Sequence, residues 1–297
     1  MTKKALLIGI DYFNNPTSQL RGCINDINNM RGMLIDAYNY LPANITMLRD
    51  DVKTPSLQPT FANILNNLKS LALQSSNLNE IWIHYSGHGS QIQDVANNDS
   101  IFRPKIDDLL VPLDYASAGY ITDIQLLSII KTIKCRCILL FDSCNSGTIC
   151  ALPWTFNYVS PTQYSRTLIN DVSIENPNIF VLSGCRDNQT SADVTNNSGR
   201  TYFGAFTNAF LEVLRLNMHN VPFLVLYRDI CVYLSNQGFS QIPVLSTTIG
   251  SPTATIVKSG PHITSITNNN ASSTPMSSNG VTAAAVVKKN MRAVIGL

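Results

Sequence analysis

Two turns rich in small residues each carry one side chain suited to covalent chemistry. Residues 86–89 are Ser-Gly-His-Gly, which places His88 between two glycines, and residues 142–147 are Asp-Ser-Cys-Asn-Ser-Gly, which contain Cys144. A thiol with an ordinary pKa near 8.5 must become a thiolate before it attacks a carbonyl carbon. A neighbouring imidazole takes that proton and later protonates the leaving amine. The two turns therefore predict a cysteine–histidine pair that cleaves peptide bonds.

The small residues around both side chains favour the same chemistry. They let a peptide backbone come close, and they leave backbone N–H groups free to bind the developing oxyanion. We expect the amides of Gly89 and Cys144 to be the donors. A single histidine after a strand is more often structural, and a single cysteine more often belongs to a core. Both residues at consecutive strand ends are a much stronger signal.

Each turn follows an apolar segment that we expect to be a strand buried on both faces. Strands and helices alternate along the chain, which predicts an α/β fold with a mainly parallel central sheet and helices on both faces. In such sheets the active site lies beyond the carboxyl ends of the strands. The expected strands are residues 5–10, 45–48, 80–85, 137–141, 178–182 and 244–247, and the expected helices are 23–40, 61–73, 123–131, 202–216 and 223–234.

Three segments have no helical or strand periodicity and are expected to be irregular. These are the polar stretch 91–103, the long connection 152–177 with its three prolines, and the end of the chain from residue 259, which is rich in Ser, Thr, Asn and Ala. We expect a catalytic domain over 1–258, made of parts 1–151 and 178–258 joined by the connection 152–177, followed by a disordered tail over 259–297.

The composition restricts the class of protein. The chain has 297 residues, of which 44% are hydrophobic and 13% charged, with a net charge of +2, and this balance argues against a nucleic-acid partner. The apolar run 5–10 is too short for a signal peptide, and no apolar stretch is long enough to cross a membrane. The seven cysteines, apart from Cys144 and Cys23, are expected to be core thiols in a reducing compartment, which predicts a cytoplasmic protein.

The sequence resembles the metacaspases, which belong to the caspase-like clan of cysteine peptidases. The resemblance covers about residues 3–250 and rests on motifs at 20–26, 86–89, 107–114, 142–147 and 183–192, with further agreement at 204–211. It implies a caspase-like three-layer sandwich, here without an N-terminal pro-domain. It also implies cleavage after Arg or Lys through a Cys-His dyad and a thioester acyl-enzyme.

The family residues that carry this preference match Cys23, Asp26, Ser86 and Asp142. The physics agrees, because a basic side chain that enters a partly desolvated pocket needs carboxylates beside it. Asp26 has another reading as a helix cap or as an acid in the first turn of a helix. Asp142 has another reading as an orienting hydrogen-bond acceptor in the nucleophile turn, and both of its roles can hold together.

The family often binds calcium through clustered aspartates. Asp107 and Asp108 match two of them, and Asp94 or Asp99 is a candidate for a third. Calcium takes six to eight oxygen ligands, usually including several carboxylates. No cofactor is required for the chemistry itself, so calcium enters only as an activator.

The sequence departs from the family around this cluster. Ala151 stands where an acidic residue is common, seven positions past Cys144, and the basic Arg103 and Lys105 precede Asp107. Positive charge there opposes a divalent cation, so calcium activation and calcium independence both stay open. Asn145 replaces the histidine that often follows the nucleophile, and we expect little effect of this change on the chemistry.

Two other functions stay open at this point. The chain is alternatively a caspase-like scaffold or regulator with little or no proteolysis, or an enzyme that selects acidic side chains, which would need arginines in its pocket. The expected partners are protein or peptide substrates with exposed Arg or Lys, bound by a monomer. Such an enzyme also meets its own basic residues, and the candidates for self-cleavage are Arg166 in the connection and Lys288, Lys289 and Arg292 in the tail.

Overall fold

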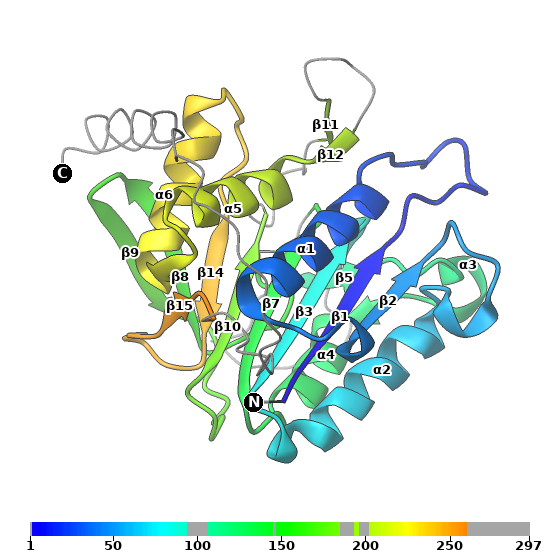
Figure 1. The fold of residues 1–297 in the computed structure, drawn as a ribbon, viewed down its shortest axis with the longest axis horizontal. Helices are drawn as coiled ribbons and strands as arrows, with labels where there is room; N and C mark the ends of the chain where they lie inside the picture. Colours follow the sequence, from blue (N-terminus) through cyan, green and yellow to red (C-terminus); the bar gives the residue numbers. More distant parts are fainter. Residues whose placement is uncertain (1, 94–105, 145–146, 185–192, 196–201, 260–297) are drawn as a thin grey trace, which may run out of the picture.

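The computed structural model describes residues 2–93, 106–144, 147–184, 193–195 and 202–259. A sheet with the strand order β2-β1-β3-β7-β10-β14-β8-β9 forms the centre of the molecule (Figure 1). Its strands are β1 (Lys3–Gly9), β2 (Ile45–Arg49), β3 (Glu80–Ser86), β7 (Arg136–Asp142), β8 (Trp154–Ser160), β9 (Gln163–Leu168), β10 (Ile179–Ser183) and β14 (Val244–Thr247).

The sheet has a parallel part and an antiparallel part. β2, β1, β3, β7 and β10 pair in parallel, whereas β14, β8 and β9 extend the sheet through antiparallel pairs. β1, β3, β7 and β10 consist largely of buried residues, as expected of strands covered on both faces. All six residues of β9 are exposed at the edge of the sheet.

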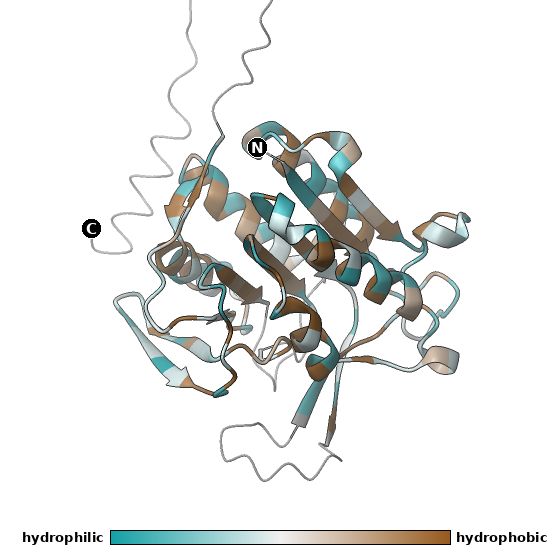
Figure 2. Ribbon diagram, turned by 90° about the horizontal axis from the view of Figure 1, so that it is seen from below, coloured by the Kyte–Doolittle hydropathy of each residue, from teal (hydrophilic) through white to brown (hydrophobic). Residues whose placement is uncertain are grey.

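Helices cover both faces of the sheet, which gives three layers. α1 (Cys23–Tyr38), α5 (Ala205–Leu216) and α6 (Phe223–Asn236) pack on one face. α2 (Phe61–Gln74) and α4 (Asp123–Ile130) pack on the other face. In Figure 2 the central strands are largely brown, whereas the helices alternate between brown and teal, as expected for elements with one buried side.

Short elements complete the described fold. A three-stranded sheet contains β4 (Gly89–Gln93), β5 (Ile106–Leu110) and β6 (Ile121–Thr122), and it begins directly after His88. Two further pairs join β11 to β12 and β13 to β15. The bounds are β11 (Asp193–Thr195), β12 (Tyr202–Gly204), β13 (Asn220–Pro222), β15 (Thr255–Val257) and the one-turn helix α3 (Tyr115–Ala118), with 3₁₀ turns at Pro42–Asn44, Pro55–Leu57 and Ser75–Asn77.

Local sequence explains where several helices begin. Thr60 caps α2 by accepting a hydrogen bond from the Asn63 N–H, and Thr122 and Gln125 form a reciprocal capping box at the start of α4. α1 has no side-chain cap at Gly22, and the Asp11 carboxylate instead accepts a hydrogen bond from the Cys23 N–H. A residue beyond β1 thus fixes the start of the helix that follows it.

The expected α/β fold with a mainly parallel sheet and helices on both faces is confirmed. All the expected strands and helices are present, with ends that differ by a few residues. Within the described residues, no helix is long and apolar enough to cross a membrane.

The expectation of an irregular connection over 152–177 is wrong. This segment contains the β8–β9 hairpin, which adds two strands to the antiparallel side of the sheet. β9 lies at the exposed edge and therefore has no buried apolar face to detect. The aromatic and β-branched residues of β8 were the usable signal.

Three boundaries also need correction. Residues 202–204 form β12 rather than the first turn of a helix, and β15 follows the strand that we expected to be the last. Residues 91–93 belong to β4, while the rest of the expected loop up to Arg103 lies outside the described residues. Of the expected tail, only Ser259 is described, and its N–H donates to the Ala37 carbonyl at the end of α1.

Candidate active site

The turns that carry His88 and Cys144 follow neighbouring parallel strands. β3 lies beside β7 (Figure 1) and pairs with it along its whole length. In this register Ser86 lies directly opposite Asp142. Each candidate residue follows two positions later in the chain, so both emerge at the same edge of the sheet. His88 and Cys144 are half-buried, which leaves them accessible to solvent.

The two turns touch through their backbones at Gly89. A Cβ atom at Gly89 would lie 1.9 Å from the carbonyl oxygen of Cys144, a distance that no real side chain tolerates. Glycine is therefore required directly after His88 for the two turns to approach each other. This contact brings the backbone next to His88 against the backbone of Cys144.

The His88 imidazole is oriented by the loop that precedes α1. Its Nε2 atom lies 2.6 Å from the Ser18 carbonyl oxygen. Because a carbonyl oxygen only accepts hydrogen bonds, this contact assigns the ring hydrogen to Nε2 and leaves Nδ1 as the second ring nitrogen for proton exchange.

Two buried tyrosines hold the backbone of His88. The Tyr12 hydroxyl accepts a hydrogen bond from the His88 N–H at 3.0 Å and donates one to the Val111 carbonyl at 2.7 Å. The Tyr85 hydroxyl donates to the His88 carbonyl at 2.7 Å. The Tyr12 ring also lies 4.7 Å from the imidazole, centroid to centroid. Burial raises the pKa of both phenols, so they stay neutral donors and acceptors.

A buried carboxylate from α1 lies beside the end of β3. Asp26 is 1% exposed and accepts hydrogen bonds from the Ser86 hydroxyl at 2.7 Å and from the Gly204 N–H at 3.0 Å. Its position in the first turn of α1 agrees with its reading as a first-turn acid. Its contacts with β3 and β12 show that it also joins three separate segments.

A second buried carboxylate converges on the same place from β7. Asp142 is 4% exposed, and one of its oxygens accepts hydrogen bonds from both the N–H and the hydroxyl of Thr207, each at 2.8 Å. A Cβ atom at Gly204 would lie 2.1 Å from Asp142 Oδ2 and 2.8 Å from Asp26 Oδ2. The two oxygens are thus no farther apart than the sum of these distances. We call Asp26 and Asp142 the acid pair.

Cys23 lies at the base of this arrangement rather than at its surface. It is the first residue of α1, it is 3% exposed, and its N–H donates to Asp11 Oδ1 at 2.9 Å. The structure therefore brings Asp26, Ser86 and Asp142 together: Asp26 binds Ser86, and Ser86 lies opposite Asp142 in the sheet. Cys23 lies one helical turn before Asp26 in α1.

Comparison with known proteins agrees with this geometry. Residues 3–153 match the family model described as metacaspase, peptidase C14 domain. The chain belongs to the metacaspase family. The C14 peptidases are cysteine-type endopeptidases, and this class fits a histidine and a cysteine at adjacent strand ends.

Curated metacaspases match most of the chain. Metacaspase-1 of Kluyveromyces lactis is 32% identical over 82% of this chain and 65% of the relative. Metacaspase-1 of Schizosaccharomyces pombe is 32% identical over 82% of this chain and 67% of the relative. The chain thus spans about two thirds of the length of these relatives.

Solved structures support the fold. A crystal structure of a Geobacter sulfurreducens protein matches with a TM-score of 0.58 and 18% identity, over 85% of this chain and 95% of that one. Caspase-1 from Spodoptera frugiperda matches with a TM-score of 0.52 and 12% identity, over 83% of this chain and 86% of that one. The caspase-like three-layer architecture is confirmed by these matches.

Asp107 and Asp108, the two described acids that the family match offers as calcium ligands, are both buried on β5. Both oxygens of Asp108 already accept hydrogen bonds from protein donors, and as successive residues of β5 the two aspartates point to opposite faces. Within the described ranges, no group of three His, Cys, Asp or Glu side chains is placed to hold a metal. Asp94 and Asp99 lie outside the described residues.

The other described cysteines differ from Cys144 in their environment. Cys135, Cys137, Cys150 and Cys231 are buried. Burial raises the pKa of the Cys135 thiol to about 11, and it also raises the pKa values of Cys137 and Cys150. The thiols of Cys135, Cys137 and Cys150 therefore stay protonated at neutral pH, as expected of core residues.

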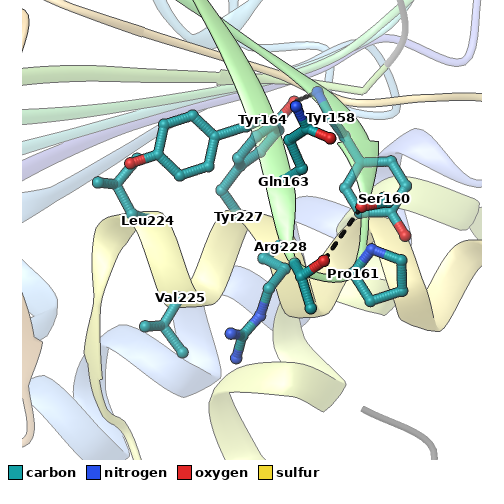
Figure 3. A pocket seen from close by; sticks show the side chains of 10 residues that line it. Tyr158, Ser160, Pro161, Gln163, Tyr164, Leu224, Val225, Tyr227 and Arg228 are labelled. Carbon is teal, nitrogen blue, oxygen red and sulfur yellow. Dashed lines mark hydrogen bonds between the residues drawn. The ribbon is translucent and has the colours of Figure 1, made fainter. Parts of the chain in front are cut away.

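A hollow elsewhere on the molecule contains none of the predicted site residues. It has a volume of about 130 Å³ and lies between the β8–β9 hairpin and α6 (Figure 3). Tyrosines and aliphatic residues form much of its wall, with Arg228 at one side. Nothing in its composition suggests covalent chemistry.

Arg166, one of the candidates for self-cleavage, is held in a strand. It lies in β9, its guanidinium donates to the Gly250 carbonyl and the Ser251 hydroxyl, and it stacks 5.1 Å from the centre of the Trp154 ring. A cleavage site must reach the active site as an extended, free segment. The structure favours a structural role for Arg166, while Lys288, Lys289 and Arg292 lie outside the described residues.

Sequence reasoning did not find Tyr12 or Ser18, and it included Thr207 in the family match at 204–211 without assigning it a role. The first two lie in the loop between β1 and α1, and their contact with His88 depends on how that loop folds back over the sheet edge. Thr207 reaches Asp142 from α5, across 65 positions of sequence. The usable signals were the position of Tyr12 shortly after a buried strand and the family match that contains Thr207.

Proposed function

We propose that this chain is a monomeric cysteine endopeptidase that hydrolyses protein substrates after Arg or Lys, in a reducing compartment such as the cytoplasm. Cys144 is the nucleophile and His88 the acid–base. The observation that carries the proposal is the acid pair, which lies beside the strand ends that bear these two residues.

The acid pair supports selection of a basic side chain through charge. Two buried carboxylates that share one space repel each other, and this repulsion is relieved when a cation enters. Arg is suited to the task because its guanidinium donates several hydrogen bonds in a plane. An acidic substrate side chain would add a third negative charge, so the pair opposes caspase-type selection of Asp.

The proposed reaction proceeds in two halves. His88 Nδ1 takes the Cys144 proton, and the thiolate attacks the carbonyl carbon after the basic residue to give a tetrahedral oxyanion. The amides of Gly89 and Cys144 are the proposed donors to this oxyanion. The intermediate collapses with cleavage of the C–N bond, the amine leaves with the proton from His88, and a thioester remains. Water then attacks the thioester as His88 takes its proton, which releases the acid and the thiol.

Labelling and turnover together test the proposal. A peptidyl inhibitor ending in Arg should modify Cys144, and peptides ending in Arg or Lys should be cleaved. Cys144→Ala and His88→Ala should each lose turnover while they remain folded, and the double variant should be little worse than either single one. Cys231→Ala, which alters a buried cysteine in α6, is the matched control.

Three results would contradict the proposal. Substantial turnover by Cys144→Ala would show that Cys144 is not the nucleophile. A folded wild-type chain without labelling or turnover would favour the scaffold alternative. Preference for Asp over Arg and Lys would favour the acid-selecting alternative.

A further inference from the structure

Asp108 lies between the two chain segments that carry the proposed catalytic residues. One segment leaves His88 and continues as β4, in which Gln91 lies opposite Asp108 on β5. The other segment leaves Cys144 and reaches Thr148 four positions later. Asp108 is 1% exposed, so its carboxylate is enclosed between these segments.

Three hydrogen bonds connect Asp108 to both segments. Asp108 Oδ1 accepts a hydrogen bond from Gln91 Nε2 at 2.9 Å. Asp108 Oδ2 accepts two hydrogen bonds from Thr148, one from the N–H at 3.0 Å and one from the hydroxyl at 2.8 Å. We call Gln91, Asp108 and Thr148 the latch.

The chain after Thr148 is itself firmly placed. The Ala151 N–H donates to the Thr148 carbonyl at 2.6 Å and closes a turn. Ile149, Cys150 and Leu152 are at most 1% exposed and belong to the core on the α2–α4 face. The nucleophile segment is thus anchored by β7 before Cys144 and by the latch after it.

Within the latch, Asp108 is one of the acids that the family match offers as a calcium ligand. A carboxylate oxygen that binds Thr148 through two hydrogen bonds has its charge balanced by donors of the chain itself. The residue seven positions past Cys144 is Ala151, and an alanine supplies no carboxylate. Ala151 is also buried, with a φ of 43°. Donors of the protein itself therefore join the two segments at Asp108.

We propose that Asp108 is a positioning residue that joins the His88 and Cys144 segments through Gln91 and Thr148, so that activity does not depend on calcium. The proposal rests on the proposed peptidase function for its activity readout. It predicts that the latch acts on the reactivity of Cys144 itself and not on the choice of substrate.

Thr148 offers the cleanest substitutions, because Thr148→Val keeps the size of the side chain and removes only the hydroxyl. We expect kcat to fall about tenfold, the factor typical of one hydrogen bond to a charged group, with KM little changed. Alkylation of Cys144 by iodoacetamide should slow in parallel. Thr148→Ser restores the hydroxyl and should recover most of both rates.

The matched control is Thr247→Val in β14. Thr247 is fully buried, and its hydroxyl donates to the Ile249 carbonyl at 2.6 Å, far in sequence from the latch. This variant should lower the melting temperature about as much as Thr148→Val while it leaves kcat and the alkylation rate unchanged. Equal loss of kcat in both variants would show a general effect of stability and overturn the latch.

Calcium independence is tested by measuring kcat of the full chain in EGTA and in millimolar calcium. Wild-type kcat should be the same in both conditions, and calcium should not rescue Thr148→Val. Loss of activity in EGTA that calcium reverses would overturn calcium independence, and wild-type rates in Thr148→Val would overturn the latch. If no peptide is cleaved at all, the proposed function fails, while the alkylation rates of the same variants still decide whether the latch positions Cys144.

Discussion

Two buried carboxylate sites lie at the same edge of the sheet, and they differ in how many carboxyl groups share the space. At the acid pair, Asp26 and Asp142 come from α1 and β7 and point their oxygens at one point beside Gly204. At the latch, Asp108 bridges Gln91 and Thr148, and its neighbour in sequence points to the opposite face of β5. Both sites accept hydrogen bonds from neutral donors, so hydrogen bonding alone does not separate them.

The difference shows what a buried acid can be used for. Two negative charges in one place favour a cation, whereas one charge held by donors from two segments joins those segments. The first arrangement suits recognition of a basic substrate, and the second suits positioning of the reacting groups. Substitutions at the acid pair should therefore weaken the recognition of basic substrates, whereas substitutions at the latch should lower the reactivity of Cys144.

The largest expected effect is at the acid pair. Asp26→Asn should lower kcat/KM for Arg and Lys peptides by roughly 10²-fold or more, because it removes one partner of a buried charge interaction. Alkylation of Cys144 by iodoacetamide should stay close to the wild-type rate, in contrast to Thr148→Val. Asp36→Asn, which alters an exposed acid of the same helix, is the control. If alkylation and cleavage fall together, Asp26 has a structural role instead.

Protonation of His84, which lies on the same side of the sheet as the acid pair, should change the free energy of unfolding rather than the recognition of substrate. His84 is fully buried on β3, and burial lowers its pKa to about 4 from an ordinary value of 6.5. Above pH 6.5 neither the folded nor the unfolded state is protonated at this residue. As the pH falls from 6.5 to 4, only the unfolded state binds a proton, so the free energy of unfolding should decrease by about 3 kcal/mol.

Chemical denaturation across this pH range tests the assignment. His84→Leu cannot take up the proton, so its unfolding free energy should show a shallower slope between pH 6.5 and 4 than the wild type. Identical slopes for the two proteins would mean that His84 does not titrate as its burial implies.

A smaller effect is expected from the tyrosines that hold His88. Tyr12→Phe removes the acceptor for the His88 N–H, and kcat should fall by about three- to tenfold, as for loss of one neutral hydrogen bond. Tyr40→Phe is a matched control, since Tyr40 is a buried tyrosine whose hydroxyl binds Glu80 at the opposite edge of the sheet. An equal decrease in both variants would argue against a specific role for Tyr12.

The slowest expected process is self-cleavage. Intact-mass measurement over time should show that the wild type loses a C-terminal fragment at Lys288, Lys289 or Arg292, and that Cys144→Ala stays intact. Cleavage at Arg166 is not expected, because this residue of β9 is paired with Phe156 of β8 in the sheet. Loss of the same fragment from Cys144→Ala would assign the cut to another protease.

The central part of the fold could be predicted because buried parallel strands have continuous apolar sequences. β3 and β7 were recognisable on this basis, and the turns after them identified His88 and Cys144. β9 could not be found in this way, because an exposed edge strand has no apolar pattern.

The contacts around the site depend on tertiary approach and were harder to predict. Ser18 and Tyr12 reach His88 through a loop without periodicity. Asp108 was recognised as an important acid from the family match, but its partner Thr148 is 40 positions away in the sequence. Sequence spacing indicates which residues are reactive, whereas the partners that orient them appear only when distant segments pack.

One measurement tests the central claim most directly: the ratio of kcat/KM for two peptides that differ only in Arg or citrulline before the cleaved bond. Citrulline has nearly the shape of Arg without its charge. The acid pair predicts that the wild type cleaves the Arg peptide at least about 10²-fold faster, and that this ratio collapses in Asp26→Asn. Equal rates for both peptides in the wild type, or a ratio unchanged by Asp26→Asn, would contradict recognition by the acid pair.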